Sequence, residues 1–196
     1  LYGFSALGLL SDSPCKPCDV NRNGLSIGVA AGFMLLERQE DRDSSLTLLG
    51  YGESSDAHHM STPHPEGSGA ALAMERALNR AAMKPIDIDY INLHGTGTPA
   101  NDLAEDRAVC RTFGQGTPCS STKGRTGHTL GAAGITEAIL VPLCLRHDFI
   151  PGTLHTDQID PQLQSGVMLR SEFRPLRSVI RNSFGFGGNN CSLNFW

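Results

Sequence analysis

The stretch IDYINLHGTGTPANDLAEDRAVCRTF, residues 88–113, predicts a strand, a loop and a helix in direct succession. Its first seven residues, 88–94, favour a short strand. Residues 101–113 favour a helix, with Asn101 or Asp102 as the expected N-cap and acidic side chains in the first turn, where they complement the helix dipole. A glycine- and threonine-rich loop joins the two. The stretch therefore predicts one repeating unit of an α/β domain.

Strands and helices alternate on both sides of this unit. Further strands are expected at residues 25–37, 45–54, 117–122, 166–170, 178–185 and 189–196, and further helices at residues 67–83 and 131–149. Residues 25–37 form a continuous apolar run, and residues 131–149 are apolar nearly all round, so we expect both segments to be buried. This order predicts a layered α/β/α domain around a mixed sheet.

Composition excludes several classes of function. The net charge of −4, from 16 Lys and Arg against 20 Asp and Glu, argues against nucleic-acid and anionic-membrane partners. No apolar run approaches the length of a membrane span. The six cysteines lack the spacing of a disulfide framework, which indicates reduced thiols and a cytoplasmic setting. The CxxC of Cys15 and Cys18 has no second pair of ligands, so we expect no metal site.

The apolar start of the chain, LYGFSALGLL (1–10), has neither the basic residues nor the cleavage site of a signal peptide. It resembles the end of a helix that was entered midway. We therefore expect the 196 residues to be a piece of a longer protein.

Three glycine-rich loops carry the residues of chemical interest. His94 ends a predicted strand, Lys123 and His128 lie in SSTKGRTGH (120–128), and Phe184 and Phe186 alternate with glycine in NSFGFGGNN (182–190). Each residue taken alone has a structural explanation, such as a solvated lysine or a histidine that caps a helix. Two histidines, one lysine and free backbone N–H groups at strand ends together predict a single pocket.

The segments HGTGTPAND (94–102), SSTKGRTGHTLGAAG (120–134) and NSFGFGGNN (182–190) resemble, in this order, the C-terminal motifs of the β-ketoacyl-acyl-carrier-protein synthases of the synthase II type. These ketosynthases are condensing acyltransferases of the thiolase fold. The resemblance implies a layered α/β/α fold with a mixed five-stranded sheet, and makes residues 1–196 the C-terminal domain. GESSDAHHM (52–60) is most similar to the ketosynthases of bacterial aryl polyene pathways.

The resemblance also implies roles for individual residues. His94 and His128 would donate hydrogen bonds to the malonyl thioester carbonyl, where negative charge develops during decarboxylation. Lys123 would supply a positive field rather than act as a nucleophile. The backbone N–H of Phe186 would provide half of an oxyanion hole and its ring a gate, with Phe184 beside it. The remaining expected members are the supporting acids Glu137, Asp102 and Glu105, and the pantetheine-binding hydroxyls of Thr96 and Thr98.

The expected reaction is a Claisen condensation of malonyl carrier protein with an acyl-enzyme thioester. No metal or organic cofactor is expected, since both substrates are carried on the phosphopantetheine of an acyl carrier protein. The implied partners are that carrier protein, the N-terminal half of the same enzyme, and a second ketosynthase or a chain length factor in a dimer.

The nucleophilic cysteine of the family is expected in the N-terminal half, so these 196 residues alone should be inactive. None of the cysteines at positions 15, 18, 110, 119, 144 and 191 lies in a matching motif. Two alternatives remain. A chain-length-factor subunit, which is non-catalytic, is disfavoured by the presence of both histidines and the lysine. A thiolase is disfavoured by His128 and by the context of Cys191.

Overall fold

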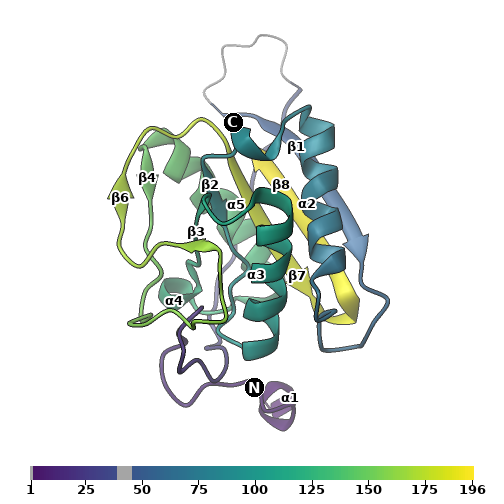
Figure 1. Ribbon diagram of the computed structural model, residues 1–196, viewed down its shortest axis with the longest axis vertical. Coiled ribbons are helices and arrows are strands. Elements are labelled where there is room, and N and C mark those ends of the chain that lie inside the picture. The colour runs from purple at the N-terminus through teal and green to yellow at the C-terminus, as the bar shows by residue number, and fades with distance from the viewer. Residues whose placement is uncertain (1, 39–45) are drawn as a thin grey trace.

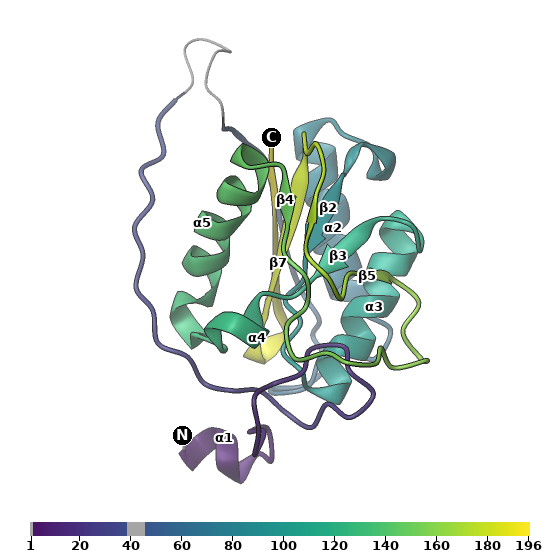
Figure 2. The ribbon, with the colours of Figure 1, turned by 90° about the vertical axis from the view of Figure 1, so that its left-hand side faces the viewer.

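A six-stranded sheet lies between two layers of helices in the computed structural model, which describes residues 2–38 and 46–196 (Figures 1 and 2). Helices α2 (Ser68–Ala81) and α3 (Pro99–Phe113) cover one face, and α5 (Ala133–Arg146) covers the other. The predicted α/β/α class with a mixed sheet is therefore confirmed. In the described part of the chain the sheet has six strands rather than five, because a two-residue strand extends one edge.

The strand order is β1-β8-β7-β2-β3-β5. The strands are β1 (Leu48–Ser55), β8 (Asn189–Phe195), β7 (Val179–Gly185), β2 (Tyr90–Asn92), β3 (Pro118–Ser120) and β5 (Gly166–Val167). Antiparallel pairs join β1 to β8 and β8 to β7, whereas β7, β2, β3 and β5 run parallel. Because β7, β2 and β3 are parallel neighbours, their carboxyl ends lie side by side at the same end of the sheet.

The central strands are buried on both faces, as parallel strands between helix layers usually are. Tyr90 and Ile91 of β2 and Val179 and Ile180 of β7 are fully buried. Ile91 and Ile180 belong to the apolar core under α2 and α3, and Tyr90 and Val179 to the core under α5. One sheet thus separates two cores.

The smaller elements lie around this framework. They are α1 (Tyr2–Ala6), α4 (Lys123–Thr126), the pair β4 (Phe149–Ile150) and β6 (Glu172–Phe173), and single 3-10 turns at Pro85–Asp87, Leu130–Ala132 and Phe186–Gly188. Within residues 2–38 and 46–196, no helix has the length and hydropathy needed to cross a bilayer.

Residues 25–37 do not form the buried strand that their apolar run predicted. Leu25 is buried and Ile27 bridges His128, but residues 28–38 continue as an extended segment without a regular ladder. This segment crosses α5, where Gly32 packs over Ile135 and Ile139 (Figure 2). The opposite side of the segment is open. The apolar pattern predicted burial on both faces, whereas the described residues cover only the face toward α5.

Two further details of the prediction need correction. Helix α3 begins at Pro99 with Thr98 as N-cap, so neither Asn101 nor Asp102 caps it. Proline suits the first helical position because it has no N–H to leave unpaired. Helix α5 is shorter than residues 131–149 and is not buried all round, since Leu143 on its outer side is 42% exposed. Residue 45, the first of another predicted strand, lies outside the described residues.

Candidate active site

Loops after three neighbouring parallel strands form the candidate site. His94 follows β2, Lys123 follows β3, and Phe186 follows β7. Because these strands are parallel, the loops after them meet at one edge of the sheet, where α/β proteins commonly bind ligands. A cavity of about 980 Å³ opens there. Its lining includes His94, His128, Phe184, Phe186, Thr96 and Thr98.

The two histidine rings face each other edge to face, with their centroids 5.2 Å apart. Nδ1 of His128 accepts a hydrogen bond from the backbone N–H of Leu130 at 3.1 Å. A neutral imidazole that accepts at Nδ1 carries its proton on Nε2. Burial, aided by the charge of Lys123, lowers the pKa of His128 to about 4. His128 is therefore a neutral ring at pH 7, with an N–H donor at Nε2.

His94 is 4% exposed, and its ring also contacts Phe184, with 5.7 Å between the centroids. Burial lowers the pKa of His94 well below its usual value, and Lys123, His128 and Arg181 act in the same direction. Its Nδ1 is buried and has no hydrogen-bond partner among the described residues. The site therefore presents two neutral imidazoles to one cavity.

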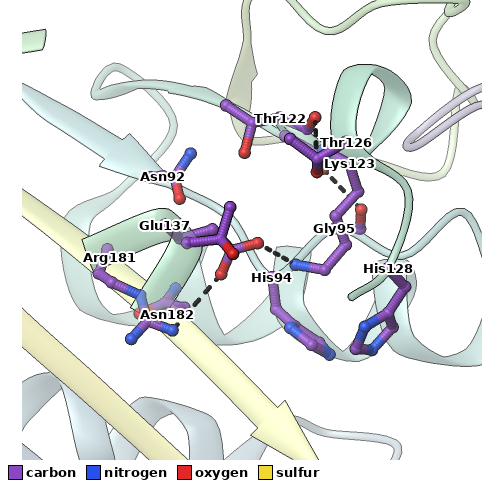
Figure 3. A network of polar contacts seen from close by, with 12 residues as sticks. Asn92, His94, Gly95, Thr122, Lys123, Thr126, His128, Glu137, Arg181 and Asn182 are labelled. Atoms are coloured by element: carbon purple, nitrogen blue, oxygen red, sulfur yellow. Dashed lines mark hydrogen bonds and ion pairs between the residues drawn. The ribbon is translucent and has the colours of Figure 1, made fainter. Parts of the chain in front are cut away.

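Lys123 lies behind the histidines and is fully buried. Its ammonium forms an ion pair with Oε1 of Glu137 on α5 (Figure 3). The second oxygen of Glu137 lies 3.4 Å from the guanidinium of Arg181. With its ammonium committed to Glu137, Lys123 acts on the cavity through its charge. The sequence singled out Lys123 and Glu137, but not Arg181; a lone arginine in the apolar run of β7 was the available signal.

Glu105, on α3, holds the backbone of the His94 loop. Its two carboxylate oxygens accept hydrogen bonds from the backbone N–H groups of His94 and Gly95, both at 2.8 Å. Asn182 of β7 donates a third hydrogen bond at 3.1 Å. Burial nevertheless raises the pKa of Glu105 to about 7. Glu105 thus ties the loop after β2 to α3 and to β7.

Asp102 holds the next part of the same loop. Its carboxylate accepts hydrogen bonds from the backbone N–H groups of Cys18, at 2.8 Å, and Gly97, at 3.2 Å. Nε of Arg22 lies 3.6 Å away, and Arg22 also donates to Asp160 at 2.6 Å. This buried ionic cluster was not predicted from the sequence. It joins three loops that are far apart along the chain.

The threonines and phenylalanines lie at the cavity wall. The hydroxyls of Thr96 and Thr98 are 2.8 Å apart and hydrogen-bonded to each other. Phe186 is 48% exposed, and its ring centroid lies 5.7 Å from that of Phe4. Gly187 and Gly188 follow with φ of 80° and 75°, a backbone conformation that favours glycine. The turn after Phe186 therefore depends on both glycines.

Five of the six cysteines are poorly suited to act as a nucleophile here. All six are free. Burial raises the thiol pKa of Cys18, Cys119 and Cys191, and raises those of Cys110 and Cys144 to about 11, which disfavours the reactive thiolate. Among the described residues, no three His, Cys, Asp or Glu side chains are grouped as a metal site would require.

Comparison with known proteins identifies the relatives of this chain. The sequence profile of a family described as "Beta-ketoacyl synthase, C-terminal domain" matches residues 46–157. The chain is 41% identical over 211 residues to 3-oxoacyl-[acyl-carrier-protein] synthase 2 of Vibrio harveyi, and the match covers 100% of this chain and 51% of the relative. Overall, the chain spans about half the length of the curated relatives it matches.

Solved structures give the same result. One is a ketosynthase (ApeO) in complex with its chain length factor (ApeC) from Xenorhabdus doucetiae; the matched chain is 45% identical with a TM-score of 0.88, covering 98% of this chain and 48% of that one. Another is a type II polyketide acyl carrier protein in complex with its ketosynthase, at 27% identity and a TM-score of 0.94, covering 99% of this chain and 52% of the other. Both likenesses extend over nearly the whole chain.

Proposed function

This chain belongs to the β-ketoacyl synthase family, and we propose on that basis that residues 1–196 are the C-terminal half of a carbon–carbon bond-forming acyltransferase. The rest of the enzyme supplies a cysteine that carries the acyl group as a thioester. The half described here supplies the groups that convert malonyl carrier protein into a nucleophile. The reaction is a decarboxylative Claisen condensation.

In the first step, the bond between the malonyl carboxylate and its α-carbon breaks and carbon dioxide leaves. The electron pair moves onto the thioester carbonyl, whose oxygen becomes an enolate. His94 and His128 donate hydrogen bonds to this oxygen from fixed positions, so negative charge develops where donors already point. Lys123 adds a positive charge behind both rings. Neutral rings suit this task, because each carries an N–H donor and can be buried without the cost of burying a charge.

In the second step, the α-carbon of the enolate attacks the carbonyl of the acyl thioester and forms the new carbon–carbon bond. The acyl oxygen carries the negative charge of the tetrahedral intermediate, and the backbone N–H of Phe186 donates to it. The intermediate then collapses, the cysteine leaves as a thiolate, and a β-ketoacyl thioester remains on the carrier protein. The adjacent ring of Phe184 packs against His94 and limits its movement.

The substrate arm is phosphopantetheine attached to an acyl carrier protein, and we assign its hydroxyl and amide contacts to Thr96 and Thr98. Both threonines line the same cavity as the histidines. A relative that carries its own carrier protein in the solved complex supports this partner. The reaction as written needs no metal or organic cofactor, since loss of carbon dioxide drives it.

One observation carries this proposal: two neutral imidazoles face one cavity with 5.2 Å between their centroids, in front of a buried lysine–glutamate ion pair. The test uses the full-length protein with acyl carrier protein and malonyl carrier protein, and detects the β-ketoacyl product by mass spectrometry. Product formation that is lost in His94→Ala and in His128→Ala is expected. Full activity in both variants would contradict the mechanism.

A chain-length-factor subunit is the second candidate, because related chains occur in complexes of a ketosynthase with its chain length factor. Such a subunit shapes the tunnel of its partner and catalyses nothing itself. The retained histidines and Lys123 favour the catalytic subunit of a homodimer or of such a heterodimer, in the cytoplasm and in an aryl polyene type of pathway. The residue at the nucleophile position of the full-length protein, read from its sequence, distinguishes the two candidates.

A further inference from the structure

Arg181 is a buried cation that the reaction described above does not use. It lies in the middle of β7 and is 2% exposed. Arginine is almost never fully buried unless a partner balances its charge. The neighbouring residues of β7, Val179 and Ile180, are apolar and fully buried. A charged side chain at this position therefore calls for a specific explanation.

The partner of Arg181 is Glu137, which already has another. The Arg181 Nη2 atom lies 3.4 Å from Oε2 of Glu137, and the ammonium of Lys123 pairs with Oε1. Figure 3 shows Glu137 between the ends of Lys123 and Arg181, with the ring of His94 on the Lys123 side. The guanidinium packs against the first turn of α5, since a Cβ on Gly134 would lie 3.7 Å from Nη2, an ordinary van der Waals distance.

The charges of this cluster do not cancel. Two cations share one carboxylate, so Lys123, Glu137 and Arg181 together carry one net positive charge. All three residues are at most 2% exposed, and solvent therefore screens that charge weakly. A simple Lys123–Glu137 pair would be neutral by comparison. The third member changes the field that the cavity receives.

We propose that Arg181 is a positioning residue that divides the Glu137 carboxylate between two cations, so that a net positive charge remains beneath His94 and His128. The inference rests on the proposed function, in which both histidines act as neutral hydrogen-bond donors. Arg181 does not touch the substrate. It acts through Glu137 and Lys123 by preventing the carboxylate from neutralising the lysine.

The groups that surround the histidines are consistent with this role. Lys123, on α4, lies behind both rings, and the two rings face each other. Arg181 acts on His94 from β7, and Glu105 approaches from α3, where its carboxylate holds the backbone N–H of His94. Burial is the main cause of the low pKa of His94, and Lys123, His128 and Arg181 lower it further. Without Arg181, the pKa of His94 should rise. As the pH is lowered, His94 would then become protonated at a higher pH than in the wild type.

The experiment compares Arg181→Gln with Arg181→Lys in the full-length enzyme. Glutamine can still donate a hydrogen bond to Glu137 but carries no charge, whereas lysine keeps the charge. Arg177→Gln, at an exposed arginine just before β7, is the matched control. The readout is the titration of the His94 ring, followed by NMR with ¹³C-labelled histidine and assigned with His94→Asn. The acid limb of the pH profile of malonyl decarboxylation is measured in parallel.

The titration midpoint of His94 is expected to rise by roughly half a unit to one unit in Arg181→Gln. The acid limb of decarboxylation should move by the same amount in the same direction. Arg181→Lys and Arg177→Gln are expected to keep the wild-type midpoint. If Arg181→Gln does not accumulate, Arg181→Met serves as the neutral variant with the same expectation.

An unchanged midpoint in a folded neutral variant, even one with a lowered melting temperature, would show that Arg181 only anchors α5 to β7 and would overturn the proposal. A midpoint that moves equally in Arg181→Lys would overturn it as well, because that variant retains the charge. The ring titration does not require product formation. Absence of product from the wild-type enzyme would therefore contradict the proposed function while the inference on Arg181 could still be judged.

Discussion

One polar neighbour orients the ring of His128, and another holds the backbone of His94. The backbone N–H of Leu130 donates to Nδ1 of His128, which leaves the Nε2 proton for a ligand. For His94 the restraint acts on the backbone, through the carboxylate of Glu105. Within residues 2–38 and 46–196, neither ring is paired with a carboxylate that would make it a proton acceptor. The pair is therefore suited to donate hydrogen bonds to a developing oxyanion rather than to remove a proton.

In the full-length enzyme, His128→Ala is expected to abolish malonyl decarboxylation while acyl loading of the cysteine continues. Loading requires the cysteine and the oxyanion hole, whereas the enolate requires both imidazoles. Loss of one preorganised donor typically costs about two to three orders of magnitude in rate. Release of labelled carbon dioxide and mass spectrometry of the acyl-enzyme measure the two steps separately. An unchanged decarboxylation rate would show that His128 is structural.

Glu105→Gln tests how the buried carboxylate holds the His94 loop. The amide group of glutamine faces two backbone N–H donors with only one acceptor, so one donor loses its partner at a cost of about 1–3 kcal/mol. The wild-type pKa of about 7, against 4.5 in the unfolded chain, adds a pH dependence. Between these values the folded chain retains a proton that the unfolded chain has released, so wild-type stability falls as the pH rises.

The stability difference between wild type and Glu105→Gln should therefore be larger at pH 5 than at pH 8. From the shift of the Glu105 pKa, this stability difference is expected to decrease by roughly 3 kcal/mol between pH 5 and pH 8. Thermal melts of the full-length protein at both pH values measure it. Glu66→Gln, at an exposed side chain paired with Arg107, is the control and should show no such trend. A difference that does not depend on pH would mean that Glu105 is already ionised at pH 5.

The sequence located the histidines and the lysine, and the family resemblance named the supporting acids Glu137, Asp102 and Glu105, but not the groups with which those acids pair. Glycine-rich loops after predicted strands are a local pattern, so His94, Lys123 and His128 could be identified without a structure. The partners of Glu105 and Asp102 are backbone N–H groups of a loop, and the partner of Arg181 is on another element. Such pairings arise from packing of distant segments, and no spacing along the chain encodes them.

At the scale of elements, β1 and α2 pack unusually closely. Gly50 and Gly52 alternate with larger residues along β1, so both glycines face α2. A Cβ on Gly52 would overlap the carbonyl oxygen of Ala73, and one on Gly50 the carbonyl oxygen of Ala77. Small residues on strand and helix together let the two backbones approach. This contact fixes the edge of the sheet nearest the cavity wall at Glu53 and Ser54.

Gly52→Ala is therefore expected to destabilise the fold by about 1–3 kcal/mol or more, because the obstacle is the backbone of a helix and cannot rotate away. A lowered melting temperature of the full-length protein measures the effect. Gly116→Ala is the matched control, since no atom lies within 4 Å of a Cβ at that position. Equal melting temperatures for the two variants would show that α2 can shift away from β1 at little cost.

Helices with one apolar side were predicted more closely than segments that are apolar throughout. Periodicity identified α2 within two residues at each end, because its buried face repeats at helical spacing. Residues 25–37 and 131–149 carry apolar side chains on all sides, and such a pattern does not distinguish a strand from an extended segment. Their true environment depends on what covers their outer faces. That information belongs to the whole molecule rather than to the local sequence.

At the scale of the whole molecule, residues 1–196 produced alone are expected to yield no β-ketoacyl thioester. The proposed reaction needs an acyl group on a cysteine, and the thiols whose pKa values are raised by burial are poor nucleophiles. The assay supplies both carrier-protein substrates and searches for product by mass spectrometry. The full-length enzyme under the same conditions is the positive control. Product from the 196 residues alone would refute the assignment of the nucleophile to the other half.

The extended segment that crosses α5 shows why these residues should also need a covering partner. Val29 and Phe33 are each 97% exposed and Leu35 is 83% exposed, and they alternate along the segment with Gly32 and Met34, which pack against α5 and the core beneath it. Contiguous apolar patches of this kind are rare on soluble monomers. In the proposed enzyme the N-terminal half would cover this side, so that the apolar run is buried on both faces as its sequence pattern predicts.

Residues 1–196 expressed alone are therefore expected to self-associate in light scattering and to bind a hydrophobic dye. The triple variant Val29→Ser, Phe33→Ser and Leu35→Ser should reduce both effects, because it makes the open side polar without altering the residues that face α5. A control triple change to serine at the exposed polar residues Glu75 and Asn79 of α2 and Arg111 of α3 should leave them unchanged. A monodisperse wild-type monomer with a cooperative melt and no dye binding would contradict this expectation, since the domain would then be complete without its proposed partner half.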